Sequence, residues 1–161
     1  MINLDSWLLQ KNLENALTSP VFLEGKIWEV KGETVSPEGD SERDTWMIIE
    51  DPWSSNLSIF EDKAKNFATP TLRIIVPPEA RWMKREKLIS KLPSLLDARR
   101  QGESEQTENS VRSIMLEWWR VDLESITIRT IGAVFPAWIL NLEGREDVLL
   151  HAINGRTYPL P

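Results

Sequence analysis

The fold that we expect is decided by residues 113–142, SIMLEWWRVDLESITIRTIGAVFPAWILNL. This stretch holds three of the eight tryptophans of the chain and its densest run of isoleucine, valine and leucine. Burial of such side chains is the dominant favourable term in folding. We therefore expect the stretch to be the buried spine of a sheet rather than a reaction centre.

Two parts of this stretch have different patterns. Residues 125–131, SITIRTI, alternate cleanly between apolar and polar side chains, which predicts a strand. Residues 111–122 fit either a strand with both faces covered or a helix capped by Ser110. The bulky aromatic side chains favour the strand, in a central position of the sheet.

Downstream of the spine, the sequence predicts hairpins. Residues 138–142 and 148–153 flank a short polar segment, which indicates two antiparallel strands. Asn154-Gly155 is the strongest short turn signal of the chain, and we expect residues 156–160 to fold back as an edge strand blunted by proline.

Upstream, apolar residues at helical spacing predict a first helix that Asp5 or Ser6 caps and that ends before Pro20. A second short helix should begin at Ser54 or Ser55 and extend through Phe67. A bulge or tight turn is expected at Gly25. The strands expected in this half are residues 21–30, 34–35, 45–50 and 71–76.

A basic helix should follow Pro77-Pro78 and run over residues 79–91. Pro93 should interrupt it, because an interior proline costs about 3 kcal/mol and removes a hydrogen bond. The chain would then restart as one or two turns over residues 94–100.

These elements indicate one α+β domain over residues 1–161, with a largely antiparallel sheet and two or three helices packed on it. Residues 36–44 and 101–109 lack large apolar side chains, and we expect them to be mobile loops. Trp7, Trp46, Trp118 and Trp138 lie in apolar runs and are expected in the core.

Composition excludes several kinds of site. The chain has no cysteine and one histidine, His151, so thiolate chemistry is excluded and a zinc site is not expected. We expect no bound cofactor, because no phosphate-binding or nucleophile motif is present. No apolar run is long enough to span a bilayer, and no signal peptide is evident, so we expect a cytoplasmic protein without a membrane partner.

The charge of the chain is polarised. Residues 79–100 carry seven basic and three acidic side chains, whereas the whole chain has a net charge of −6. Cations on one helix beside an aromatic ring can hold an acidic protein face or a phosphate backbone. Trp53, in an expected loop, and Trp82 are harder to bury and could anchor a partner. The predicted binding residues are Arg81, Trp82, Lys84, Arg85, Lys87, Lys91 and Trp53.

The function that we expect is therefore that of a non-catalytic interaction protein. It would be a small accessory subunit of a larger protein assembly, or of a nucleoprotein assembly containing RNA or DNA, contacting its partners through the basic helix and the acidic loops. One alternative is an acidic inhibitor or immunity-type protein that covers a basic partner site, with carboxylates of residues 37–51 as contacts. Another is an enzyme whose site is assembled from scattered residues.

Overall fold

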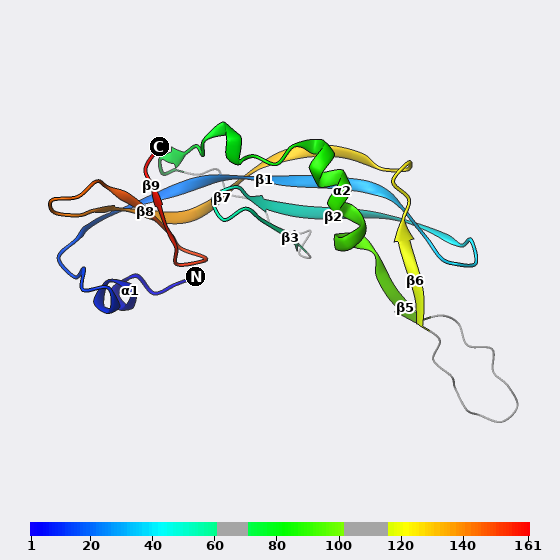
Figure 1. The fold of residues 1–161 in the computed structure, drawn as a ribbon, viewed down its shortest axis with the longest axis horizontal. Coiled ribbons are helices and arrows are strands. Elements are labelled where there is room, and N and C mark those ends of the chain that lie inside the picture. The colour runs from blue at the N-terminus through cyan, green and yellow to red at the C-terminus, as the bar shows by residue number, and fades with distance from the viewer. Residues whose placement is uncertain (61–70, 102–115) are drawn as a thin grey trace, which may run out of the picture.

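The computed structural model describes residues 1–60, 71–101 and 116–161, which form a long, curled, mostly antiparallel sheet (Figure 1). The expected α+β fold is therefore wrong, because strands dominate and only two α-helices lie in the described part of the chain. The strands are β1 Leu17–Val35, β2 Ser41–Asp51, β3 Asn56–Phe60, β4 Ile74–Ile75, β5 Ala98–Gln101, β6 Leu116–Val121, β7 Thr127–Asn141, β8 Val148–His151 and β9 Thr157–Pro159. The helices are α1 Leu4–Gln10, the 3-10 turn η1 Glu79–Arg81, and α2 Arg85–Leu96.

The sheet is organised around β1 and β7. The order of the main strands is β3-β2-β1-β7-β8-β9, and β4 and β6 also pair with β1. β1 and β7 pair continuously from Leu17 opposite Asn141 to Lys31 opposite Thr127, and both run along the long axis of the molecule (Figure 1). The centre of the fold is therefore this pair of long strands, and β1 was expected only as two shorter pieces.

The spine stretch divides between two strands with different roles. β6 is a strand, as the aromatic side chains favoured, but its Trp118 is 41% exposed and the strand is not central. β7 is a single strand that joins the two segments expected at 125–131 and 138–142. The hairpin of β7 with β8 and the edge strand β9 after Asn154-Gly155 are confirmed.

Gly25 lies in the middle of β1 without a bulge, because the pairing of β1 with β7 continues in register on both sides of it. The glycine instead makes room for an aromatic ring across the strand pair. A Cβ atom at Gly25 would lie 2.2 Å from a ring carbon of Phe135. Any larger residue would displace this ring, so we interpret Gly25 as a packing requirement.

The first helix is shorter than expected. α1 begins after Asn3, whose side-chain Oδ1 accepts a hydrogen bond from the Ser6 amide, so neither Asp5 nor Ser6 is the cap. The helix ends at Gln10, and Asn12 has a φ of 56°, in the left-handed region that stops a helix.

The basic helix begins and ends later than expected. Residues 79–81 form only the 3-10 turn η1, the α-helix begins at Arg85, and α2 continues through Pro93 to Leu96. Leu88, Leu92 and Leu96 recur every four residues and are buried against the sheet. Burying each leucine contributes roughly 1.5–3 kcal/mol. Together they offset the cost of about 3 kcal/mol for an interior proline.

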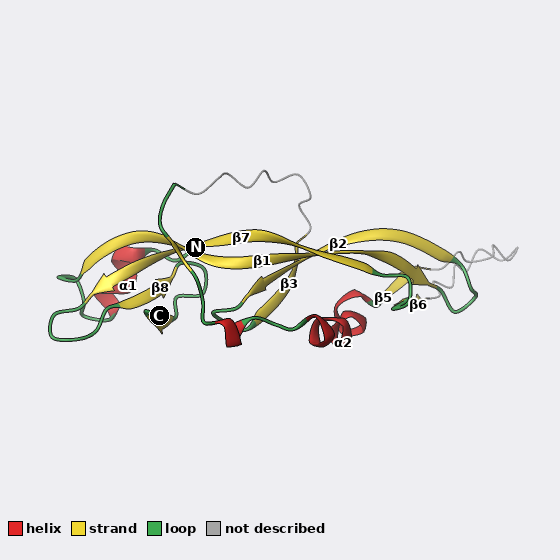
Figure 2. Cartoon of the chain, turned by 90° about the horizontal axis from the view of Figure 1, so that it is seen from above, coloured by secondary structure: helices red, strands yellow, loops and turns green. Residues whose placement is uncertain are grey.

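Three buried clusters follow one another along the sheet. One cluster contains Trp28, Val30 and Ile48 and is covered by α2. Another contains Leu140 and Leu150 and is covered by α1. Figure 2 shows the two helices toward opposite ends of the molecule. The middle cluster contains Trp53 and the strand residues that surround it, Val21, Leu23, Ile75, Ala137 and Leu149.

Several short segments also differ from the structure predicted for them. Residues 41–44, expected in a loop, belong to β2, and residues 36–40 form a tight turn. The expected helix at 54–67 is wrong where it can be seen, since residues 56–60 form β3, and residues 64 and 67 lie outside the described residues. In the segment 71–76 only β4 is strand. The loop expected at 101–109 lies outside the described residues apart from Gln101, which ends β5.

None of the helices in the described part of the chain is long and apolar enough to cross a membrane.

Candidate functional site: a basic groove beside the second helix

A groove of about 360 Å³ lies where η1 and the start of α2 approach the end of β2 and the start of β3. Four cations and one tryptophan of the predicted binding set line it together. We call this site the basic groove and define it by Arg81, Trp82, Lys84, Lys87, Lys91 and Glu50.

The helix geometry explains why these cations share the groove. Lys87 and Lys91 are four residues apart, which places them on one face of α2, and Lys84 is the residue that directly precedes the helix. The neighbouring face carries the buried leucines, so the helix cannot rotate without exposing them. Arg85 is exposed but does not line the groove, because successive helical residues are turned by about 100°.

Among the described residues, no side chain neutralises the cations of the groove. Within the described ranges, no carboxylate forms an ion pair with Arg81 or with the three lysines. All four side chains are exposed, and an anion could reach them without displacing an internal partner.

Glu50 forms the buried base of the groove, with 2% of the residue exposed. One carboxylate oxygen accepts a hydrogen bond of 2.9 Å from the indole Nε1 of Trp28, and the other accepts one of 2.7 Å from the backbone N–H of Met83. Glu50 thereby holds the segment that carries Trp82 and Lys84 against the sheet.

Trp82 and Trp28 both contact the ammonium group of Lys26. The ammonium nitrogen of Lys26 lies 4.5 Å from the ring centroid of Trp82 and 4.9 Å from that of Trp28. A cation within about 6 Å of an aromatic face is attracted by its electron density. Because Lys26 lies over one face of the Trp82 ring, that face is less available for stacking on a partner.

Trp53 was expected to be an exposed anchor, but only 4% of the residue is accessible to solvent. Its indole Nε1 donates to the carbonyl of Glu24, and its ring packs edge-on against Tyr158 at a centroid distance of 6.1 Å. The expectation that Trp53 is hard to bury is wrong, because the curl of the sheet encloses the turn after Pro52.

His151 forms a buried pair with Asp51, with 2.7 Å between Nε2 and Oδ2. The Nδ1 atom accepts from the backbone N–H of Ile153, so in the neutral ring the proton is on Nε2 and is donated to the aspartate. Asp51 also accepts from the amides of Trp53 and Ser54. The imidazole is 1% exposed and fully bonded, so we interpret the pair as a structural contact.

The pKa of Asp51 reflects opposing effects. Burial raises it, but the hydrogen bond from His151, the positive charge of a protonated His151 and the hydrogen bonds of Ser54 outweigh burial. The net result is a pKa below the usual 3.8, so the carboxylate is favoured.

A second fixed carboxylate is Glu29, which lies directly opposite Arg129 in the pairing of β1 with β7. The guanidinium Nε and Nη2 atoms donate to the two carboxylate oxygens at 2.7 and 2.9 Å. These hydrogen bonds lower the pKa of Glu29 against the opposing effect of burial, and the charges of Arg129 and Lys31 lower it further. The pair ties the two central strands together.

Sequence reasoning found the cations of the groove but missed Glu50 and Lys26. Glu50 ends an apolar strand, a place where a carboxylate is ordinarily solvated, and its two partners come from distant segments. Only the pairing of β1 with β2, which sets Lys26 opposite Glu50, could have suggested that these residues share a site.

In the described segments, no group of three or more histidine or acidic side chains is placed to hold a metal ion. The chain matches no protein-family model, no curated protein and no solved structure.

Proposed function

We propose that the protein is a non-catalytic accessory subunit whose basic groove receives an acidic segment of a larger protein partner. The observation that carries this proposal is the gathering of four cations, unpaired within the described residues, around one groove with a rigid base. Carboxylates of a partner would form charge-assisted hydrogen bonds with them.

A protein segment fits the groove better than a nucleic acid does. Outside residues 79–100 the chain carries a net charge of −10, which repels a long polyanion more than a short acidic segment. The ring of Trp82 is engaged by Lys26, which leaves it less available for stacking on a base. The proposed assembly is therefore held by protein–protein contacts.

The test is co-purification of the tagged protein from its native cell, followed by identification of the proteins recovered. The variant K87Q/K91Q removes two groove charges and keeps both side chains polar. We expect the amount of the main partner recovered with this variant to fall by at least about 90% relative to the unsubstituted protein, since each charged hydrogen bond contributes about 1.5–3 kcal/mol. The matched control R43Q/R85Q also removes two charges, from exposed residues outside the groove, and should retain the partner.

A nuclease arm separates the two classes of partner. Association that survives nuclease supports an acidic protein segment, whereas association that nuclease abolishes would replace the proposal with nucleic-acid binding. Equal recovery with both charge variants would remove the basic groove from the function.

The proposed setting is the cytoplasm, supported by the absence of cysteine from the 161 residues.

A further inference from the structure

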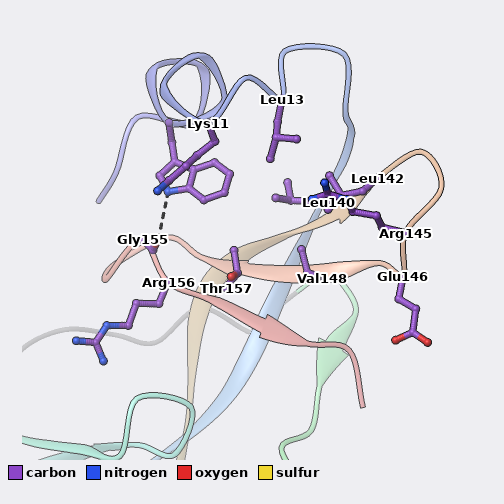
Figure 3. A pocket seen from close by; sticks show the side chains of 11 residues that line it. Lys11, Leu13, Leu140, Leu142, Arg145, Glu146, Val148, Gly155, Arg156 and Thr157 are labelled. Atoms are coloured by element: carbon purple, nitrogen blue, oxygen red, sulfur yellow. Dashed lines mark hydrogen bonds between the residues drawn. The ribbon is translucent and has the colours of Figure 1, made fainter.

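A second and larger cavity, of about 800 Å³, lies at the other end of the sheet (Figure 3). It is formed where α1 and the segment after it face the β7–β8 loop and β9. Sites for drug-sized ligands have volumes of about 300–1,000 Å³. The cavity therefore has the size of a small-molecule site.

The wall of this cavity is apolar and held in place. Leu140 is completely buried, and Leu13, Leu142 and Val148 are half-buried around it. The indole of Trp7 also lines the cavity, and its Nε1 donates to the carbonyl of Gly155 at 3.2 Å. The half-buried side chains of Leu13, Leu142 and Val148 offer a surface for the apolar body of a ligand, and Leu140 supports them from below.

The rim of the same cavity is cationic. Lys11, Arg145 and Arg156 line it against a single carboxylate, Glu146. None of the three cations is ion-paired with a carboxylate of the described residues. In Figure 3, Arg145 extends from its loop toward Leu140, whereas Arg156 points away from the wall. Arg145 is therefore the cation best placed above the apolar surface.

We propose that this cavity binds a small amphipathic anion, with an apolar chain against the leucine wall and a carboxylate or phosphate head at Arg145. The planar guanidinium suits both head groups, because it can donate two parallel hydrogen bonds to either. Lys11, whose ammonium nitrogen is 6.0 Å from the Trp7 ring centroid, adds positive charge on the opposite side. This site is separate from the basic groove and does not depend on the function proposed for it.

Isothermal titration calorimetry of the full chain tests the proposal with three probes, decanoate, decyl phosphate and decanol, each below the concentration at which it aggregates. We expect one site, at which at least one anion binds about tenfold or more tightly than decanol. Octanoate should bind more weakly than decanoate, by up to about fourfold for each methylene lost. Tighter binding of decanoate or of decyl phosphate identifies the head group, and either result supports the site.

The variant R145Q locates the head group. We expect it to weaken binding of the anion about tenfold and to leave decanol unchanged. R43Q, which removes an exposed arginine outside the cavity, is the matched control and should bind as the unsubstituted protein does. The proposal is overturned if no anion binds, if decanol binds as tightly as both anions, or if R145Q and R43Q have the same affinity.

Discussion

Single buried polar side chains decide how the segments of this protein meet. Glu50 is the clearest case, because its two carboxylate oxygens satisfy two donors, Trp28 Nε1 and Met83 N–H, from different parts of the chain. A buried donor left without an acceptor costs about 1–3 kcal/mol. The carboxylate therefore fixes the geometry of the basic groove as well as its stability.

The substitution Glu50→Gln tests this role. A glutamine has only one acceptor oxygen, so one of the two donors would face the amide NH₂ group. We expect a loss of about 1–3 kcal/mol in the free energy of unfolding, measured by urea denaturation. The exposed residue Glu38 provides a control, since Glu38→Gln should change stability by less than about 0.5 kcal/mol. Equal stability of the two variants would contradict the role given to Glu50.

At the scale of elements, α2 shows tertiary packing overriding a local signal. Pro93 lies inside the helix, although proline removes an intrahelical hydrogen bond and its ring clashes with the preceding turn. The helix persists because Leu88, Leu92 and Leu96 lie on its buried side.

Replacement of this proline should stabilise the protein. In Pro93→Ala the new N–H can donate to the carbonyl of Ile89, and the unfolded chain gains only a little entropy. We expect a net gain of about 1–2 kcal/mol in urea denaturation, with a small rise in helical circular dichroism. Ser94→Ala, at the next and exposed position, is the control for a general gain in helix propensity. A loss of stability in Pro93→Ala would show that the proline ring itself is needed for packing.

At the scale of the whole molecule, the curl of the sheet brings distant strands together. β2 and β8 are separated by β1 and β7, so in a flat sheet they would be three strand spacings, about 14 Å, apart. Asp51 at the end of β2 nevertheless bonds His151 at the end of β8. This contact closes the curl around Trp53 and the middle cluster.

The Asp51–His151 contact predicts a pH dependence of stability. Because the folded pKa of Asp51 is lowered, its contribution is present above the usual value of 3.8 and is lost as pH falls through the folded pKa. Asp51→Asn should therefore destabilise the protein by about 1–3 kcal/mol at pH 6, and the difference from the unsubstituted protein should shrink below about pH 4. Urea denaturation from pH 2.5 to 7 measures both, with the exposed-site variant Asp40→Asn as control. A difference between the two proteins that stays constant over this range would contradict the assignment.

The parts of the fold that follow from local pattern were predictable. An apolar run located the core of β2, alternation located the start of β7, and the hairpin pattern located its end. Asn154-Gly155 located the turn before β9, and the charge count located the cations of the basic groove. Gly32 lies between the expected strands 21–30 and 34–35, and Pro136 lies between 125–131 and 138–142, so the long strands β1 and β7 were expected in pieces. The helical spacing of Leu57 and Phe60 was misleading, because both residues lie in β3.

By itself, the sequence determined which residues carry charge, which runs must be buried, and where the tight turns fall, because these depend on side chains close together along the chain. Only the tertiary structure decided that β1 and β7 form one continuous pair, that Trp53 is enclosed, and that Glu50 joins the basic groove. Each of these outcomes depends on contacts between residues far apart in sequence, and the curl of the sheet brings those residues together. Residues 113–142 were expected to form one buried spine, but their described part contains two strands, β6 and β7. The centre of the sheet is set by strand pairing with β1 rather than by apolar density.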